Sequence, residues 1–366
     1  MEWTVLRVKG QYMVSERFPV VSVVTPSYNQ AEFLEETILS VLNQDYPNLE
    51  YIIIDGGSTD GSVDIIRKYE DRLAYWVSEP DEGQADGVNK GWRHARGQIL
   101  GWINSDDTYA PGAVRTVVRF LDKHYAVDMV YGHMNMIDGT GKIIWTVEPS
   151  ADFDLNSLIY STFFIPQPTV FLRKHVLDKV GMLDTSLDHC MDCDLWHRIG
   201  MNFTVRGIPE VIANFRKQPA AKSYDVPLDT IVERYLVANR YGGAGNSAPP
   251  AEMLVYRWAQ LLTNDLRKDH LEFLERDWSL MPLELSAALQ PLRRYVTAKA
   301  YLQAALAHTA SGRLSSAAIC FWSAVREDPP VLVRDGGIFL SMLRASRRLL
   351  RACRRRFTGA GRISSG

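Results

Sequence analysis

The sequence predicts an α/β protein built on a largely parallel β-sheet with helices on both faces. Short apolar runs rich in β-branched residues alternate with segments of helical periodicity over the first half of the chain. Strands that are apolar throughout are typical of sheets covered from both sides. After about Asp225 the strand signals stop and long helical patterns follow. We therefore expect an α-helical region at the C-terminal end.

The expected strands are apolar runs followed by turn residues. They are 20–25, 51–55, 74–77, 98–104, 128–133 and 142–147, the last two as a hairpin around 138–141. The expected helices are 31–44, 62–70 and about 112–124. In the first helix, Leu34, Ile38 and Val41 fall on one face. The prolines of 166–175 favour a rigid loop before a further strand.

Composition narrows the class of protein. The chain has 366 residues, of which 46% are hydrophobic and 23% charged, as in ordinary globular proteins. A formal net charge of -2 gives no reason to expect a nucleic-acid partner. Four cysteines argue against a disulfide framework, and the single C-x-x-C of Cys190 and Cys193 lacks the second pair of a zinc site. The first ten residues lack the pattern of a signal peptide, and no apolar run nears the roughly 20 residues of a membrane span, so we expect a cytoplasmic protein.

An acidic side chain ends the apolar run YIIID, directly before a glycine-rich turn. Asp55 is followed by Gly56 and Gly57, which let the backbone turn away. Ligands of α/β sheets bind beyond the carboxyl ends of strands, so Asp55 is placed to accept hydrogen bonds from a base or ribose. Asp60 fits two roles equally, as a ligand contact or as the cap of the helix that follows. No dinucleotide or P-loop glycine motif follows a strand.

A second acidic pair, Asp106 and Asp107, follows the run QILGWIN. Adjacent carboxylates repel each other unless a positive charge lies beside them. Mg²⁺ is commonly held by one or two carboxylates together with phosphate oxygens of a substrate. A capping role for the helix beyond Pro111 fits less well, because several residues intervene.

Four motifs in order make the sequence resemble the family 2 glycosyltransferases of bacterial cell-wall and exopolysaccharide synthesis. They are TPSYN (25–29), DGGSTDGS (55–62), EPDEGQADGVNKG (79–91) with ARGQILGWINSDD (95–107), and MDCDLWHRIG (191–200). The resemblance covers about residues 18–224. It implies a GT-A-like, Rossmann-type mixed sheet flanked by helices.

The resemblance also implies site residues. The nucleotide would be bound by Thr25, Pro26, Tyr28, Asn29, Asp55, Asp86, Asn89 and Asp106. Within this set Asp55 would contact the base, which is expected to be uracil. Asp106 and Asp107 would bind Mn²⁺ or Mg²⁺, and Asp192 would be the general base. Asp194 is the rival base, but in a helix the two side chains point about 200° apart.

The implied reaction is inverting transfer of a hexosyl or N-acetylhexosaminyl group. The donor would be a nucleotide sugar, most simply a UDP-sugar, and the acceptor a hydroxyl of a glycan or lipid-linked glycan. Two positions depart from the family pattern, because Asn104 stands where Asp is frequent and Gln218 where a histidine is frequent. Arg216 and Lys222 are candidates to neutralise the diphosphate instead. The departures keep open a catalytically inactive protein that binds sugar nucleotides.

The expected organisation has three parts: a catalytic domain at 1–225, a helical appendage at 226–330, and a basic amphipathic helix with a tail at 331–366. Residues 301–330 have spacings like one tetratricopeptide hairpin, which keeps a helical scaffold as a further alternative. In 338–357, apolar residues gather on one helical face and arginines on another. Such a helix either lies on the inner face of the membrane, making the protein peripheral, or docks on its own protein.

Overall fold

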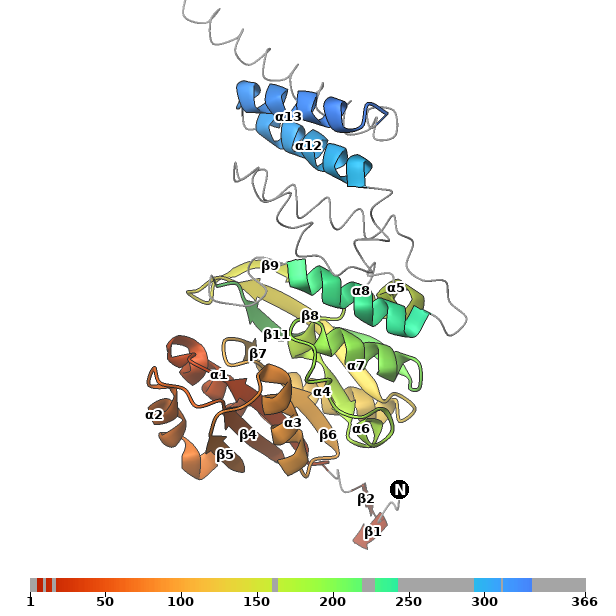
Figure 1. Ribbon diagram of the computed structural model, residues 1–366. Helices are drawn as coiled ribbons and strands as arrows, with labels where there is room; N and C mark the ends of the chain where they lie inside the picture. The colour runs from red at the N-terminus through yellow and green to blue at the C-terminus, as the bar shows by residue number, and fades with distance from the viewer. Residues whose placement is uncertain are drawn as a thin grey trace, which may run out of the picture. The chain divides into compact units, whose positions relative to one another are not determined.

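The computed structural model describes residues 5–8, 11–14, 18–159, 164–218, 228–242, 293–310 and 312–330. The chain divides into two compact units, Met1–Asp225 and Val226–Gly366. Among the described residues, the first unit carries the strands and the second carries helices (Figure 1).

In the described part of the chain, nine strands form one mixed sheet in the order β5-β4-β3-β6-β10-β8-β11-β7, with β9 paired to β8. They are β3 (Val21–Ser27), β4 (Leu49–Asp55), β5 (Tyr75–Ser78), β6 (Ile99–Trp102), β7 (Thr108–Tyr109), β8 (Met129–Ile137), β9 (Ile143–Val147), β10 (Phe171–Arg173) and β11 (Val205–Arg216). A separate hairpin joins β1 (Val5–Val8) and β2 (Gln11–Val14).

The first unit also contains seven helices among its described residues. They are α1 (Ala31–Leu42), α2 (Ser62–Arg67), α3 (Gln84–His94), α4 (Ala113–Lys123), α5 (Leu155–Ile159), α6 (His175–Val180) and α7 (Met191–Gly200). Short 3-10 turns occupy Glu70–Arg72 and Gln167–Thr169.

The parallel half of the sheet consists of β5, β4, β3 and β6. From β3 the chain moves outward to β4 and β5, and then returns past β3 to β6 (Figure 1). The strand order therefore reverses between β3 and β6. This reversal leaves a position beyond the carboxyl ends where α/β proteins bind ligands.

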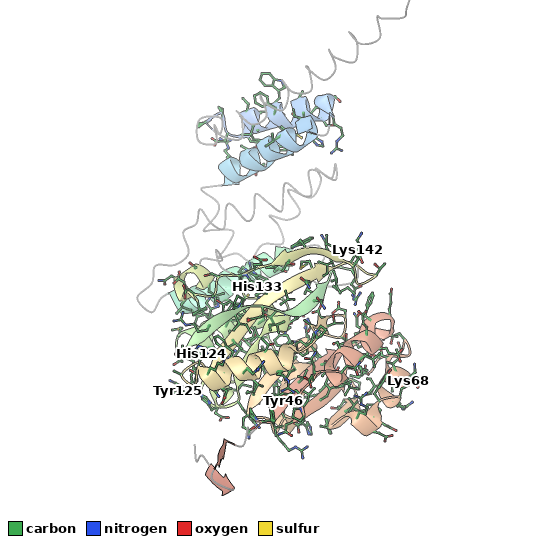
Figure 2. The ribbon with its side chains drawn as sticks, turned by 180° about the vertical axis from the view of Figure 1, so that it is seen from behind. Tyr46, Lys68, His124, Tyr125, His133 and Lys142 are labelled. Carbon is green, nitrogen blue, oxygen red and sulfur yellow. The ribbon has the colours of Figure 1, made fainter. Side chains whose placement is uncertain are left out.

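The other half of the sheet is mixed. β10 runs antiparallel to both β6 and β8, β11 is parallel to β8, and β7 is antiparallel to β11. The sheet is therefore mixed, as the resemblance implied, and less parallel than the alternation of strands and helices alone predicted. The β8–β9 hairpin forms around 138–141 as expected, and Lys142 in its turn is exposed at the margin of the unit (Figure 2).

Helices cover both faces of β3, which explains why all seven of its residues are buried. On one face, Val23 packs in a core cluster with Leu34 and Ile38 of α1 and Val117 of α4. On the other face, α3 contacts β3 and β4. The continuous apolar run of β3 in the sequence is therefore explained by burial of the strand on both faces.

Helix α3 was not expected, because its glycines conceal the helical pattern. Gly91 lies against β3 so closely that an added Cβ would be 2.3 Å from Val24 Cγ1. A Cβ at Gly87 would be 3.4 Å from Pro26 Cβ. These glycines allow the helix to approach the sheet, although glycine disfavours an isolated helix.

Strand β11 was also missed. Its sequence contains Gly207 and Pro209, and the pairing with β8 shifts register between Gly207 and Val211 and again before Ala213. Proline inside an apolar run argues against a strand, so the pattern was misleading. The strand matters because its carboxyl end places Arg216 within hydrogen-bond distance of Asp106 and Asp107, in the turn after β6.

The second unit contains α8 (Leu228–Gly242), α12 (Arg293–Ala310) and α13 (Leu314–Glu327) among its described residues. The last two form a hairpin whose buried contacts join Ala298 and Leu302 to Ala324. A turn with Gly312 at a φ of 80° precedes α13. The hairpin occupies the expected segment, although its first helix begins earlier.

The basic amphipathic segment 338–357 lies outside the described residues, so its contact with a membrane or with the protein stays a prediction. Within the described ranges, no helix is long and apolar enough to cross a bilayer.

Candidate functional site

Polar side chains form a row at the carboxyl edge of the parallel strands. Ser27 ends β3, Asp55 ends β4 and Ser78 ends β5. The strand registers pair Ser27 with Asp55 and Asp55 with Ser78. The Ser27 hydroxyl is buried and has no hydrogen-bond partner among the described residues. Sequence analysis did not single out Ser27, although its place in TPSYN, at the end of an apolar run, is a signal that could have found it.

Asp55 holds the glycine-rich turn in place. Its carboxylate accepts hydrogen bonds from the backbone N–H of Gly57 at 3.2 Å and Ser58 at 2.9 Å. It also accepts from the hydroxyls of Ser58 at 2.6 Å and Ser78 at 2.7 Å. The side chain is 0% exposed. Asp55 therefore shapes the turn at the strand end, and direct contact with a base stays a prediction.

Asn29 joins the end of β3 to the same turn. Its backbone N–H donates to Ser58 Oγ at 2.8 Å, and its Oδ1 accepts from the backbone N–H of Thr59 at 2.9 Å. Asn29 has a φ of 50°, in the left-handed region that asparagine tolerates better than most residues. Asp60 accepts from the backbone N–H of Ala31 at 2.9 Å, so it caps α1 rather than only the helix that follows it.

The other expected residues of β3 differ in exposure. Thr25 is fully buried and accepts a hydrogen bond from the Tyr51 hydroxyl at 3.1 Å. Pro26 is buried beneath α3. Tyr28 is 62% exposed, so it is the one of these three residues whose side chain is open to a ligand.

The start of α3 brings charged groups to the glycine-rich turn. Asp86 pairs with Lys90 at 3.3 Å, and Lys90 pairs with Glu79 at 3.2 Å. Asp81, which sequence analysis did not assign, lies so close to Gly56 that an added Cβ there would be 3.0 Å from Asp81 Oδ2. Burial raises the pKa of Asp81.

Asn89 lies on a different part of α3. Its side-chain amide exchanges two hydrogen bonds with the backbone of Leu183, at 2.9 and 3.0 Å. The side chain is 3% exposed. These bonds hold Asn89 to the loop after α6, and its contact with a ribose or diphosphate stays a prediction.

The acidic turn, residues 104–107, begins two residues after the end of β6. Asp107 is 1% exposed; its Oδ1 accepts from the backbone N–H of Arg216 at 2.9 Å, and its Oδ2 has no partner among the described residues. Burial raises the pKa of Asp107 well above its usual range, and the neighbouring Asp106 charge raises it further. Burial also raises the pKa of Asp106, although a hydrogen bond from Gln218 opposes this.

Asn104 is engaged in a polar network. Its Oδ1 accepts from Gln84 Nε2 at 2.7 Å and from Trp102 Nε1 at 2.8 Å. Its amide nitrogen donates to Gln167 Oε1 at 3.3 Å. The oxygen of Asn104 is therefore used to hold α3 to the end of β6, which leaves the acidic role in the turn to Asp106 and Asp107.

Arg216 does not lie open to a diphosphate, because it is 1% exposed and surrounded by acceptors. Its guanidinium group pairs with Glu36 of α1 and donates to the backbone carbonyl of Asp106 at 2.9 Å. Gln218 donates from Nε2 to Asp106 Oδ2 at 3.0 Å. Lys222 lies outside the described residues.

The acidic turn fits a divalent cation. It offers two adjacent carboxylates, one with a buried oxygen that has no partner among the described residues, and burial raises the pKa of both. A positive charge beside such a pair stabilises its ionised form, and carboxylate oxygens are the ligands that Mg²⁺ and similar cations prefer. Among the described residues, no group of three or more His, Cys, Asp or Glu side chains gathers into a metal site.

Helix α7 carries the two candidate bases near its start. Asp192 is partly exposed, and its Oδ1 accepts from the backbone N–H of Cys193 at 2.7 Å. Asp194 is 2% exposed and accepts from Arg198 at 2.8 Å. Leu195 and Trp196 are buried as expected, so they anchor the motif. Cys190 and Cys193 form no disulfide.

Comparison with known proteins identifies chains of similar sequence. A family model described as "Glycosyl transferase family 2" matches residues 22–181. An uncharacterized glycosyltransferase of Rickettsia prowazekii is 26% identical over 277 residues, covering 74% of this chain and 85% of that protein. One from Mycobacterium tuberculosis is 32% identical over 169 residues, covering 45% and 63%. One from Rickettsia typhi is 30% identical over 186 residues, covering 49% and 58%; against these last two, the chain matches less than two thirds of the relative.

Solved structures show a similar fold. Residues 1–349 of S. aureus TarS align with a TM-score of 0.52 and 20% identity, covering 87% of this chain and 92% of that one. The same protein in complex with UDP-GlcNAc aligns with a TM-score of 0.51 and 17% identity, with the same coverage.

Proposed function

Residues 22–181 place the chain in glycosyl transferase family 2, on a GT-A-like fold, and from this premise we propose a metal-dependent, inverting glycosyltransferase. It would move a hexosyl or N-acetylhexosaminyl group from a UDP-sugar to a hydroxyl of a glycan or lipid-linked acceptor. The observation that carries the proposal is the acidic turn, where Asp106 and Asp107 follow a parallel strand at the point of strand-order reversal. A bound donor would place its diphosphate there.

The glycine-rich turn supports a nucleotide as the donor's leaving group. Five hydrogen bonds with Asp55 and Asn29 tie this turn to the ends of β4 and β3, and Ser78 at the end of β5 donates a sixth to Asp55. The edge beside Tyr28 is therefore built before any ligand arrives. A turn that is held in advance loses little conformational entropy on binding. TarS, which shares the fold, has been crystallised with UDP and with UDP-GlcNAc.

Asp106 and Asp107 would hold the cation, Mn²⁺ or Mg²⁺. Such an ion, when bound, neutralises the charge that develops on the departing diphosphate. The protein's own contribution is to keep both carboxylates together at the strand end, where Arg216 and Gln218 donate to them.

Asp192 would be the general base. In a single displacement, the acceptor oxygen forms a bond to the anomeric carbon while the bond to the diphosphate oxygen breaks. The acceptor proton passes to the Asp192 carboxylate, and the configuration at carbon inverts. The partial exposure of Asp192 supports this role over Asp194, whose carboxylate is buried in an ion pair.

The test is turnover of a panel of UDP- and GDP-sugars by the full chain, with Mn²⁺ or Mg²⁺ and with excess EDTA. We expect turnover of a UDP-sugar that EDTA abolishes. Asp106→Ala and Asp107→Ala should each reduce it by about 10²-fold or more. Asp45→Ala is the matched control, because that aspartate is 83% exposed and pairs with Arg115 of α4.

Full activity in EDTA would contradict the metal assignment. Tight binding of UDP without turnover of any sugar nucleotide, in the presence of acceptors, would favour the inactive sugar-nucleotide-binding protein instead.

A further inference from the structure

We propose that Arg216 and Gln218, at the carboxyl end of β11, are positioning residues that set the affinity of the acidic turn for a divalent cation. The inference deepens the proposed function and rests on it. It concerns how the chain holds Asp106 and Asp107 in a geometry that one cation can share.

Arg216 forms a hydrogen bond with the backbone of the acidic turn. Its Nε–H donates to the carbonyl of Asp106 at 2.9 Å, and its own backbone N–H donates to Asp107 Oδ1 at 2.9 Å. Another guanidinium nitrogen donates to the carbonyls of Asp138 and Gly139, each at 3.2 Å. Because the guanidinium is planar with donors in fixed directions, these contacts fix the turn relative to the β8–β9 hairpin.

Helix α1 contacts both the Arg216 guanidinium and the acidic turn. Glu36 accepts from the remaining guanidinium nitrogen, and the Phe33 ring lies 4.8 Å from the guanidinium carbon. Thr37 donates its hydroxyl to the carbonyls of Ser105 at 3.0 Å and Asp107 at 2.7 Å. The backbone of the turn is therefore held between α1 and β11.

Gln218 contacts the carboxylate of Asp106 itself. Its Nε2 donates to Asp106 Oδ2 at 3.0 Å, while the Gln218 side chain is 5% exposed. Two adjacent carboxylates repel each other and would rotate apart without donors on each of them. One donor from Gln218 and one from the Arg216 backbone hold the pair together, as outer partners do for the ligands of metal sites.

Lys217 offers a matched control within the same segment. Its backbone N–H donates to the carbonyl of Ile137 at 2.8 Å, and its ammonium lies 6.0 Å from the centre of the Trp145 ring. It lies between the two positioning residues in sequence, yet its side chain is directed to β9. Replacing Lys217 removes a charge next to the Trp145 ring in the same segment and leaves its backbone bond to Ile137 in place.

The experiment measures Mn²⁺ binding to the full-length protein in the presence of UDP, by electron paramagnetic resonance, with circular dichroism to verify folding. We expect Gln218→Leu and Arg216→Lys to raise the Mn²⁺ dissociation constant by about 10-fold or more, the usual effect of losing an outer partner. Lys217→Met should stay within about twofold of the wild type.

Arg216→Lys can fail to fold because the guanidinium is buried, so Gln218→Leu, at the end of the strand and close to isosteric, is the deciding variant. Wild-type Mn²⁺ affinity in folded Gln218→Leu would overturn the positioning role while leaving the proposed function intact. A wild type that binds no Mn²⁺ with UDP would overturn both.

Discussion

Asp194 and Arg198 form an ion pair at 2.8 Å within α7, with the Asp194 side chain 2% exposed. The same guanidinium donates to the carbonyls of Val180, Gly181 and Met182. Asp194 therefore fastens the start of α7 to the loop after α6. Asp192, two residues earlier, takes no part in these contacts and is partly exposed.

This relationship separates the effects of two similar substitutions. Asp192→Asn should lower the transfer rate by about 10²–10⁴-fold, because the acceptor hydroxyl loses its base, while UDP affinity by calorimetry stays near the wild-type value. Asp194→Asn should mainly lower the melting temperature, because the partly buried Arg198 loses the carboxylate partner of this ion pair. If Asp194→Asn abolished transfer in a stable protein and Asp192→Asn did not, the assignment of the base would be wrong.

Asp55→Asn should weaken donor binding more than it slows the chemical step. The amide cannot accept all the donors that now surround the carboxylate, so the glycine-rich turn loses the shape that receives the nucleotide. We expect a raised KM for the donor with a smaller change in kcat. Ser78→Ala is the control, because it removes one donor and keeps the carboxylate. A fall in kcat with KM unchanged would assign Asp55 to a different role.

The Glu50 carboxylate, at the amino end of β4, should make a pH-dependent contribution to the stability of the fold. It is 6% exposed, accepts from the Ser22 hydroxyl, and accepts from the backbone N–H and Nε of Arg96, each at 2.8 Å. Burial alone would raise the pKa of Glu50, but the hydrogen bonds from Ser22 and Arg96 outweigh it and the pKa is lowered. The ionised carboxylate therefore stabilises the fold above the unfolded pKa of about 4.3, and this contribution is lost as pH falls through the lower folded pKa.

Glu50→Gln should accordingly lower the free energy of unfolding by about 1–2 kcal/mol at pH 7. The difference between the variant and the wild type should shrink below about pH 4, as the wild-type carboxylate becomes protonated. Urea unfolding at pH 7 and at lower pH measures both quantities. A difference that is constant across this range would show that the charge of Glu50 contributes nothing.

Gly91→Ala tests the close approach of α3 to β3. Alanine favours a helix over glycine by about 1 kcal/mol, whereas an added methyl in a packed core costs about 1–3 kcal/mol. The new Cβ would be 2.3 Å from Val24 Cγ1, so the steric cost should dominate and the melting temperature should fall by several degrees.

Gly139→Ala is the matched control, because an added Cβ at that glycine meets no atom within 4 Å. Its melting temperature should stay close to that of the wild type. An unchanged melting temperature for Gly91→Ala would mean that α3 can move away from the sheet at little cost.

The fold was largely predictable because local patterns report burial directly. The runs at β3, β4 and β6 are apolar on both faces, which identified strands covered by helices. The elements that the sequence did not predict contain residues that disfavour the secondary structure they adopt. Examples are Gly91 in helix α3 and Pro209 in strand β11. Backbone approach and register are properties of two segments together, so neither segment shows them alone.

For the site, the sequence by itself determined the acidic and glycine-rich motifs, their order, and their place at strand ends. Only the tertiary structure decided which side chains are available, because hydrogen-bond partners come from distant segments. Asp55 and Asn89 are engaged by other parts of the protein, and Asn104 is tied to Gln84 and Trp102. The end of β11, more than 100 positions along the chain, supplies the donors to Asp106 and Asp107, since a sheet brings such residues together through strand order and not through spacing.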